Sequence, residues 1–372
     1  MKKINILHLI TRLPIGGAER MLLGVLHNLD SNQFNSVVCC IQDRGELADE
    51  VESIGVPVIS LGLMKKGRYD RSIVPILRNI MNEHHINVIH THLYHANLYG
   101  RIAANKESIP TIASVHNTYA KRKWHRHLIN WFLAKRTFRI TAGSAAVKDD
   151  LLKVDHIKNN KVAILPNAID LQRVQSNLSN KEAKYALGIE STDILIGTVG
   201  RVEEQKGHKY LLEAISHLKN NKDIQNIKLL IVGDGRLLPS LKLMAKNLDI
   251  NDISLFPGNI SNLGDIYRAI DIFVMPSLWE GLSLSMLEAM AAKLPIIATD
   301  VGGVRDVLGD NKYGKIVNPS NHIEISSAIK SLIQNYELSN KMAILGEKKV
   351  RSEYSVKAMT KQLETLYIDA LN

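Results

Sequence analysis

Short runs of aliphatic and β-branched residues alternate along this chain with longer segments in which apolar residues recur every three or four positions. The short runs are typical of strands buried on both faces, and the longer segments are typical of amphipathic helices. Because the two kinds of segment alternate from one end of the chain to the other, the pattern predicts an α/β protein with parallel sheets.

In the first half of the chain, four of the seven predicted strands are followed by a predicted helix. The predicted strands are residues 4–10, 36–41, 58–61, 88–90, 111–115, 139–142 and 162–165. The predicted helices are residues 18–29, 73–83, 96–105 and 124–134.

Residues 167–180 are rich in Asn, Ser and Gln and are predicted to form a linker, after which the alternation begins again. The predicted strands of this second half are residues 194–199, 227–232, 253–256, 272–275 and 296–299. The predicted helices are residues 208–218, 237–248, 263–269, 284–292, 324–334, 340–353 and 356–371.

The length of 372 residues exceeds that of a typical single domain. We predict an N-terminal domain over residues 1–170, a C-terminal domain over residues 171–355 and a terminal helix over residues 356–372. Both domains have the pattern of doubly wound sheets, in which ligands bind beyond the carboxyl ends of the strands. Candidate site residues should therefore follow strands.

The net charge of +10 is unevenly distributed along the chain. Residues 1–170 contain 23 Lys and Arg against 14 Asp and Glu, a balance of +9, whereas the remainder contains 24 against 23, a balance of +1. No acidic residue lies between Glu107 and Asp149. This asymmetry predicts an anionic partner for the N-terminal half.

The sequence predicts a cytoplasmic protein, with a peripheral position at the inner face of the cell membrane as an option. No apolar stretch reaches the ~18 residues of a membrane span, and the first apolar run is predicted to be a strand because it contains His8 and leads into Thr-Arg-Leu-Pro. Cys39 and Cys40 are adjacent on a predicted strand, so their side chains should point to opposite faces. Free, buried thiols in a reducing compartment are the expectation.

Two glutamates, Glu280 and Glu288, are separated by seven residues. On a single helix they would lie about 12 Å apart, which is too far for a proton-sharing dyad and wider than the ~5–9.5 Å of hydrolytic acid–base pairs. The spacing suits two carboxylates that bind hydroxyls at both ends of an extended ligand, with a helix start near residues 283–285 facing an anion between them. A ligand with hydroxyls at both ends and a diphosphate between them is a nucleotide sugar, and this is the ligand that the spacing suggests. The alternative is a solvated helix with two surface glutamates.

Residues 275–291, which contain both glutamates, resemble the Glu-x7-Glu signature of the retaining enzymes of glycosyltransferase family 4. Five further segments extend the resemblance: Gly-Gly-Ala-Glu-Arg at 16–20, Leu-Pro-Asn-Ala-Ile-Asp at 165–170, Gly-Arg-Val-Glu-Glu-Gln-Lys-Gly at 200–207, Val-Gly-Asp-Gly at 232–235 and Thr-Asp-Val-Gly-Gly at 299–303. The resemblance implies the GT-B fold, in which two Rossmann-like doubly wound domains face a central cleft and the terminal helix crosses back to the first domain.

The resemblance also implies roles for individual residues. Glu288 would bind the ribose hydroxyls of the donor, and Glu280 the hydroxyls of the transferred sugar. Arg201 and Lys206 would neutralise the donor diphosphate, a role that suits a guanidinium and an ammonium group. The backbone at a further set of residues would lie against the donor: Gly16, Gly17, Gly233, Gly281, Leu282 and Ser283.

Histidines are the remaining candidates for chemistry. His116 directly follows a predicted strand and resembles the family's N-domain histidine, which hydrogen-bonds the donor sugar. His90 and His92 share one face of a strand, but no carboxylate or cysteine accompanies them. We therefore expect His90 and His92 to line a cleft near the acceptor, and we predict neither a metal nor a cofactor.

Residues 121–139 combine Trp124, Leu128 and Trp131 at helical spacing with several Arg and Lys residues. This combination suits an anionic membrane surface, and a core-packed helix with a solvated basic face is the alternative. Because no helix-turn-helix, zinc or RNA-binding motif is present, we predict no nucleic-acid partner.

The resemblance implies a retaining glycosyltransferase, and analogy with similar chains implies a role in bacterial surface-polysaccharide assembly, such as capsule or O-antigen. The donor would be a nucleotide sugar, with a UDP-sugar favoured over a GDP-sugar, and the acceptor a glycan or a polyprenyl-diphosphate-linked sugar. In the implied mechanism the diphosphate helps to deprotonate the acceptor, so no enzymatic nucleophile is needed. A nucleotide-sugar epimerase of the same fold and a non-catalytic protein that binds anionic surfaces are the alternatives.

Overall fold

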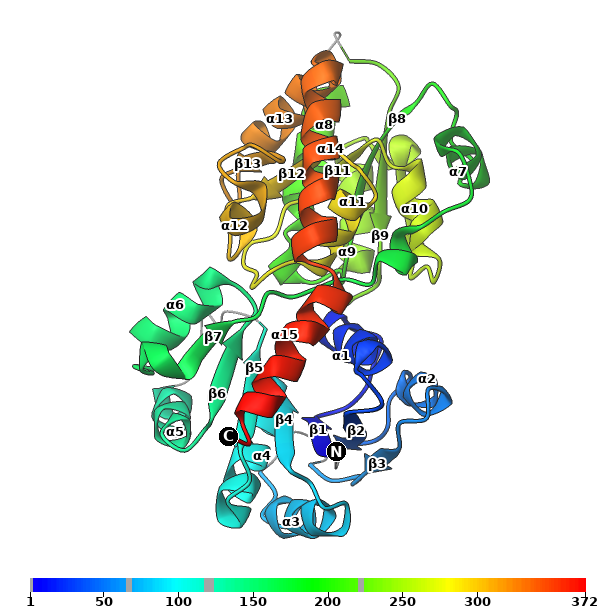
Figure 1. The fold of residues 1–372 in the computed structure, drawn as a ribbon. Helices are drawn as coiled ribbons and strands as arrows, with labels where there is room; N and C mark the ends of the chain where they lie inside the picture. The colour runs from blue at the N-terminus through cyan, green and yellow to red at the C-terminus, as the bar shows by residue number, and fades with distance from the viewer. Residues whose placement is uncertain (1–2, 65–68, 117–123, 220–223) are drawn as a thin grey trace. The chain divides into compact units, whose positions relative to one another are not determined.

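The computed structural model describes residues 3–64, 69–116, 124–219 and 224–372. The chain divides into two compact units, each built around one parallel sheet (Figure 1). The first unit consists of Met1–Ala168 and Val356–Asn372, and the second of Ile169–Ser355.

The sheet of the first unit has seven parallel strands in the order β3-β2-β1-β4-β5-β6-β7. The strands are β1 Ile4–Ile10, β2 Phe34–Cys40, β3 Val58–Ser60, β4 Val88–His92, β5 Thr111–Val115, β6 Arg139–Ala142 and β7 Val162–Ile164. The strand order reverses between β1 and β4, which is the switch point of a doubly wound sheet.

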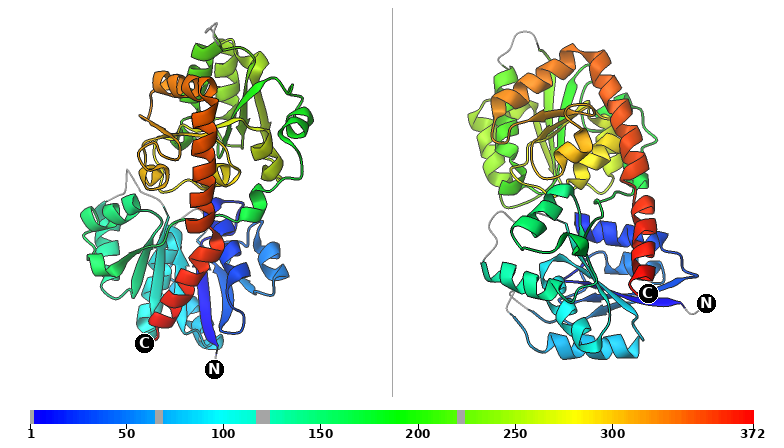
Figure 2. Two further views of the ribbon diagram at one scale, coloured as in Figure 1. Left: turned by 45° about the horizontal axis from the view of Figure 1, so that its top comes forward. Right: turned by 60° about the vertical axis from the view of Figure 1, so that its left-hand side comes forward.

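Helices cover both faces of this first sheet (Figures 1 and 2). Ile6 and Ile10 of β1 point to the face that is covered by α1 (Gly17–Asn28), α2 (Ala48–Ser53) and α15 (Val356–Asp369). Leu7 and Leu9 point to the other face, which is covered by α3 (Ile73–Glu83) and α4 (Leu93–Glu107). The helices α5 (Trp124–Ala134) and α6 (Ala145–Lys153) lie beside β5, β6 and β7.

The two cysteines occupy opposite faces of β2, as predicted. Cys39 packs with the α3–α4 layer and Cys40 with the α1–α2 layer. Both are free and buried, and burial raises the pKa of each thiol to about 12.

The sheet of the second unit has six parallel strands in the order β10-β9-β8-β11-β12-β13. The strands are β8 Ile194–Val199, β9 Ile227–Val232, β10 Ser254–Gly258, β11 Ile272–Met275, β12 Ile296–Thr299 and β13 Lys315–Val317. One face is covered by α8 (His208–Lys219), α9 (Leu238–Asn247) and α13 (His322–Gln334). The other is covered by α10 (Leu263–Ala269), α11 (Leu284–Ala291), α12 (Val304–Leu308) and α14 (Tyr336–Glu353), with α7 (Asn180–Ala186) packed against α10.

The predicted α/β class and all predicted strands are confirmed, with strand ends that differ by at most two residues. The elements that the sequence did not predict are short: β13, α2, α6, α7 and α12. The helices α2 and α12 have fewer than two turns, which is too few for a periodic pattern to appear.

The predicted linker, residues 167–180, contains the boundary between the two units, at Ala168 and Ile169, and it also has local structure. A 3-10 turn, η3 (Leu171–Val174), lies in this segment and packs against α10 and α11. Polar residues of this segment make specific hydrogen bonds: Asp170 caps the turn, and the Ser176 hydroxyl donates to Asp265 Oδ1 at 2.5 Å.

Among the helices of the described ranges, none combines the length and the apolar character needed to cross a membrane.

Candidate active site

The two glutamates lie on either side of the start of α11, after the carboxyl end of β11. Residues 276–283 form a loop that contains Glu280, and α11 begins at Leu284 and contains Glu288. Ser283 caps the helix because its hydroxyl accepts a hydrogen bond from the backbone of Met286 at 3.4 Å. The helix start is as predicted, but the two glutamates do not share one helix, so the 12 Å separation does not apply.

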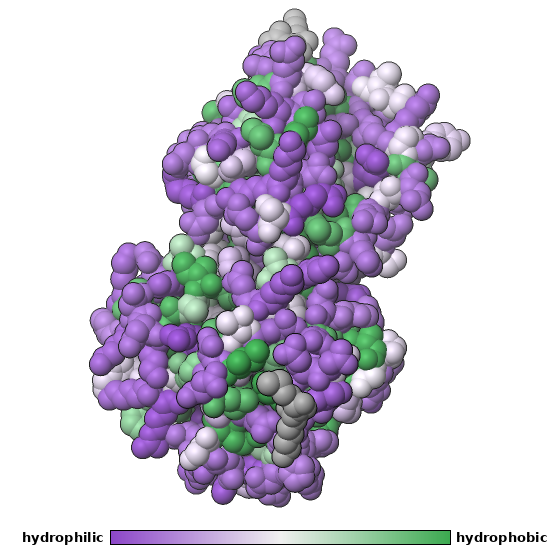
Figure 3. Space-filling view, viewed as in Figure 1, coloured by the Kyte–Doolittle hydropathy of each residue, from purple (hydrophilic) through white to green (hydrophobic). Residues whose placement is uncertain are grey.

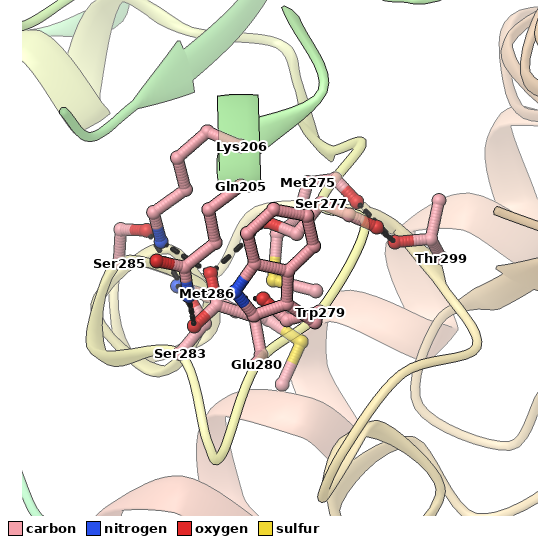
Figure 4. Close-up of polar contacts among 10 residues, drawn as sticks. All are labelled: Gln205, Lys206, Met275, Ser277, Trp279, Glu280, Ser283, Ser285, Met286 and Thr299. Atoms are coloured by element: carbon pink, nitrogen blue, oxygen red, sulfur yellow. Dashed lines mark hydrogen bonds and ion pairs between the residues drawn. The ribbon is translucent and has the colours of Figure 1, made fainter. Parts of the chain in front are cut away.

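Glu280 is buried and is held by three side chains (Figure 4). The Lys206 ammonium lies 2.5 Å from Oε1, and the Ser277 hydroxyl donates to the same oxygen at 3.0 Å. The Gln205 amide donates to Oε2 at 3.3 Å. A buried carboxylate with this many donors has a fixed orientation, and the alternative of a solvated surface glutamate is wrong.

The loop around Glu280 is also braced through its backbone. The Thr299 hydroxyl at the end of β12 donates to the Ser277 carbonyl at 2.5 Å, and Gly303 N–H donates to the Gly281 carbonyl at 2.7 Å. Gly302 has φ +55°, and a Cβ at this position would overlap the carbonyl oxygens of Glu280 and Gly281. The Thr-Asp-Val-Gly-Gly motif therefore has a structural role in holding the loop.

The segment after β8 lies against the same loop. Lys206 ends the short 3-10 turn η4 (Glu204–Lys206), and Gly207 follows it with φ +61°. A Cβ at Gly207 would overlap the Pro276 carbonyl. This close approach brings Lys206 to Glu280, so two motifs that lie far apart in the sequence form one cluster.

Glu288 on α11 has a different set of partners. Arg173 Nη1 lies 3.1 Å from Oε1, and the Tyr267 hydroxyl donates to Oε2 at 2.8 Å. Burial raises the pKa of Glu288, and the Arg173 guanidinium opposes that shift. Burial also raises the pKa of Tyr267 well above its usual range, so this hydroxyl is a donor at neutral pH.

The two basic residues predicted to face a diphosphate have different environments. Arg201 is exposed after the carboxyl end of β8. Lys206 is largely buried and paired with Glu280. The ammonium group is therefore already fixed in position, whereas the guanidinium is exposed to solvent.

Among the glycines predicted to lie against the donor, Gly233 is required by the backbone. Its φ is +133°, and a Cβ would overlap the Gly200 carbonyl. Gly16 is the N-cap of α1, and Gly17 is the first residue of that helix. Whether these backbones contact a donor stays a prediction, as do the roles of Gly281, Leu282 and Ser283.

In the first unit, His116 follows the carboxyl end of β5. Its Nδ1 lies 3.0 Å from Asn167 Oδ1, and its Nε2 is buried without a hydrogen-bond partner. Burial lowers the pKa of His116, although the contact with Asn167 opposes the shift. His116 is therefore neutral at pH 7, with one ring nitrogen available for a ligand.

His90 and His92 are buried in the sheet rather than lining an open cleft, which corrects the prediction. His90 contacts the Tyr367 hydroxyl at 2.6 Å and the Ser114 hydroxyl at 2.8 Å, so α15 covers these histidines. Within the described residues, His8, His90 and His92 form the one group of potential metal ligands with ligand atoms within 4.8 Å of one another. The absence of a metal requirement stays a prediction.

Sequence reasoning missed four partners of the glutamates. Gln205 and Ser277 lie within or beside recognised motifs, so their proximity to Lys206 and Glu280 was a usable signal. Arg173 was assigned to a linker, and Tyr267 lies in a helix that carries no motif. The last two are brought to Glu288 only by the tertiary fold.

Comparison with known families agrees with these motifs. The family model described as Glycosyl transferases group 1 matches residues 179–349, and the model described as Glycosyltransferase Family 4 matches residues 15–173. The chain is 27% identical over 384 residues to an Escherichia coli protein named UDP-Gal:alpha-D-GlcNAc-diphosphoundecaprenol alpha-1,3-galactosyltransferase. That alignment covers 99% of this chain and 97% of the relative.

Solved structures share the whole architecture. A glycosyltransferase from Rickettsia africae ESF-5 has a TM-score of 0.88 at 20% identity, with 100% of each chain covered. Anabaena Alr3699/HepE, solved with UDP and with UDP-glucose, has a TM-score of 0.85 at 18% identity, with 98% of this chain and 99% of that chain covered. At these identities the likeness shows the fold, and the predicted GT-B fold is confirmed.

Proposed function

Because this chain belongs to glycosyltransferase family 4, we propose that it transfers a sugar from a nucleotide diphosphate to a lipid-linked or glycan acceptor, with retention of anomeric configuration. The reaction would serve the assembly of a bacterial surface polysaccharide. We assign it to the cytoplasm, which accords with the two free, buried thiols.

The observation that carries the proposal is the pair of buried carboxylates at the start of α11, each held by a cation. Glu280 and Glu288 are acceptors of fixed orientation, which is the property needed to bind hydroxyls of a sugar and of a ribose. We assign Glu288 to the ribose and Glu280 to the transferred sugar. Lys206, which contacts Glu280, would then supply a positive charge to a diphosphate between those two ends.

In the proposed reaction, the bond between the anomeric carbon and the diphosphate oxygen breaks, and the acceptor hydroxyl forms its bond on the same face. The acceptor proton passes to the departing diphosphate, so charges and atoms balance without an enzymatic nucleophile. Lys206 and Arg201 would stabilise the charge that develops on the leaving group. His116, whose Nδ1–H donates to Asn167, would accept a hydrogen bond from a hydroxyl of the donor sugar at its unpartnered Nε2.

Two features of the relatives favour a UDP-sugar as the donor over a GDP-sugar. The Anabaena neighbour was solved with UDP and UDP-glucose, and the Escherichia coli relative is named for UDP-Gal. The name of that relative also specifies a diphosphoundecaprenol-linked acceptor, which supports a polyprenyl-diphosphate acceptor here.

The proposal is tested first by a thermal-shift panel of UDP-, GDP- and ADP-sugars. A donor at about 100 times its dissociation constant adds about 2.7 kcal/mol to the free energy of unfolding, which gives a clear rise in Tm. The preferred donor is then incubated with polyprenyl-diphosphate-linked sugars, and the product is analysed by mass spectrometry and by the NMR coupling of its anomeric proton. A retained configuration in an elongated acceptor is the expected result.

The same assay separates the alternatives. An epimerase would change the donor sugar without any acceptor present. A non-catalytic protein would give no product, and its behaviour in cells would not change on Glu288→Ala. An elongated product with inverted configuration would contradict the mechanism while leaving the transfer itself standing.

A further inference from the structure

The helix α5 turns five of its apolar side chains away from the unit to which it belongs. At about 100° per residue, Trp124, Leu128 and Trp131 lie within roughly 60° of one another around the helix axis, and Phe132 and Ile129 widen this arc to about 160°. All five side chains are exposed, among them Trp124 at 73%, Phe132 at 62% and Leu128 at 58%. Ala134 is the only buried residue of the helix.

The opposite side of α5 is polar and makes specific contacts with the rest of the unit. His127 Nδ1 lies 2.5 Å from Asp155 Oδ1, and the Asn130 amide donates to the other oxygen of Asp155. Arg101 on α4 donates to the Asn130 side chain at 2.5 Å and to the Asn130 carbonyl at 3.2 Å. Arg126 lies over the Tyr94 ring, 4.2 Å from its centroid.

This arrangement is the reverse of an ordinary surface helix, which buries its apolar stripe and exposes its polar side. The predicted alternative, a core-packed helix with a solvated basic face, is therefore wrong. Most of the surface visible in Figure 3 is hydrophilic, so an outward apolar face of this size needs an explanation. The hydrogen bonds to Asp155 and Arg101 hold the helix in this orientation.

Two basic side chains lie at the C-terminal end of this face. Lys135 and Arg136 are exposed directly after the last turn of α5, and the Lys135 ammonium lies 3.5 Å from the centre of the Trp131 ring. No acidic residue occurs between Glu107 and Asp149 in the sequence. Residues 121–123 of the predicted basic window lie outside the described residues.

We propose that the apolar face of α5, formed by Trp124, Leu128, Ile129, Trp131 and Phe132, docks this protein on an anionic phospholipid bilayer. The aromatic rings would enter the headgroup region, and Lys135 and Arg136 would pair with lipid phosphates. The inference rests on the proposed function in one respect, since a lipid-linked acceptor lies in the same bilayer. The side chains that form the docking surface itself all belong to α5 or to the two residues that follow it.

Vesicle binding tests the proposal with the full-length protein. Extruded vesicles of phosphatidylcholine, alone or with about 30 mol% phosphatidylglycerol, are sedimented with the protein at low and high salt. We expect sedimentation with the anionic vesicles, weaker sedimentation at high salt, and little with the neutral ones. In a Trp279→Phe background, the remaining tryptophans both lie on α5, so their emission should shift to shorter wavelength on binding.

The variants separate the contributions of the two kinds of side chain. Trp124→Ser combined with Phe132→Ser should lower the partition coefficient by about tenfold to a hundredfold. Lys135→Ser combined with Arg136→Ser should lower binding to anionic vesicles and flatten its salt dependence. The matched control, Tyr185→Ser with Tyr336→Ser, removes two aromatic side chains that are equally exposed in the second unit and should change nothing.

Three results would overturn the proposal. Unchanged vesicle binding by the Trp124/Phe132 variant is the first, and a fall in its Tm, which would reveal a packing role for the two rings, is the second. The third is a wild-type protein that does not bind vesicles but forms a nucleic-acid complex or a dimer, when the Trp124/Phe132 variant forms neither. UDP affinity, measured by calorimetry on every variant, reports on the proposed function separately and should not change.

Discussion

Two parallel sheets with corresponding strand orders present different chemistry at the carboxyl ends of their strands. In the second unit, each candidate carboxylate is paired with a cation: Glu280 with Lys206 and Glu288 with Arg173. In the first unit, His116 is neutral and has an unpartnered ring nitrogen, and the basic residues Arg126, Lys135 and Arg136 lie on helix α5 or directly after it.

The difference follows from what each unit would bind. A charged diphosphate between two hydroxyl-bearing groups needs carboxylates and an ammonium that are fixed before binding, because reorientation after binding costs free energy. Neutral hydroxyls need uncharged hydrogen-bonding groups instead. An anionic lipid surface needs a positive electrostatic potential. The same fold therefore supports a rigid charged site in one unit and a neutral, cation-rimmed surface in the other. The predictions that follow test this contrast.

Acid should destabilise the first unit more than the second. Burial lowers the pKa of His8 from 6.5 to about 3, and the pKa values of His90 and His92 are also lowered well below 6.5. In the second unit, burial lowers the pKa of His208 to about 4. Between the folded and unfolded pKa values the unfolded chain binds more protons, so stability is complete above pH 6.5 and is lost as pH falls.

Each such histidine should cost on the order of 1 kcal/mol between pH 7.5 and 5.5, so the three in the first unit should together cost roughly three times as much as His208. Urea unfolding at the two pH values gives the total, and hydrogen exchange assigns it to a unit. His8→Asn should reduce the pH dependence. If acid lowered hydrogen-exchange protection equally in both units, the proposed difference between the two units would be contradicted.

Among the single substitutions in the second unit, Lys206→Ala should lower the free energy of unfolding and the UDP affinity most. It removes the partner of a buried carboxylate, so we expect a loss of about 3 kcal/mol in the free energy of unfolding. UDP affinity should fall by about tenfold to a hundredfold, since hydrogen bonds to charged groups contribute about 1.5–3 kcal/mol. Denaturant unfolding and calorimetry measure the two effects.

Two further variants check this interpretation of Lys206. Lys209→Ala removes an exposed lysine three residues away and should alter neither quantity. Lys206→Met with Glu280→Gln removes both charges and should restore most of the stability but not the UDP affinity. Normal UDP affinity in Lys206→Ala would exclude the diphosphate role.

Glu288→Gln should have a smaller effect, because Gln preserves the shape and can still accept a hydrogen bond from Tyr267. Arg173 is about one-third exposed and remains solvated, so stability should fall by only about 1 kcal/mol. UDP affinity should fall about tenfold. Wild-type protein should prefer UDP over 2′-deoxy-UDP, and this preference should shrink in the variant; an unchanged preference would show that Glu288 does not bind the ribose.

His116→Ala should give the smallest change. The loss of one neutral hydrogen bond accepted by Nε2 corresponds to about a tenfold fall in kcat. UDP affinity should not change, because UDP lacks the sugar that His116 is proposed to contact. Steady-state kinetics and calorimetry measure the two quantities, and a fall in UDP affinity with normal kcat would move His116 from the sugar to the nucleotide.

The features that could be predicted from the sequence are those whose signals lie in one short stretch of the chain. The strand–helix alternation and the Glu280 and Glu288 motif were readable because their signals lie within a few consecutive residues. The partners of Glu288 were not, because Arg173 and Tyr267 lie 115 and 21 residues away and only tertiary packing brings them together. The outward apolar face of α5 was also ambiguous, since a helical period does not specify which side of the helix faces the core.

A crystal structure with the donor identified by the thermal-shift panel tests the central claim most directly. We predict ribose hydroxyls within about 3 Å of Glu288, hydroxyls of the sugar equally close to Glu280, and diphosphate oxygens at Lys206 or Arg201. A well-ordered donor bound elsewhere, with both carboxylates still paired only to their protein partners, would contradict the account.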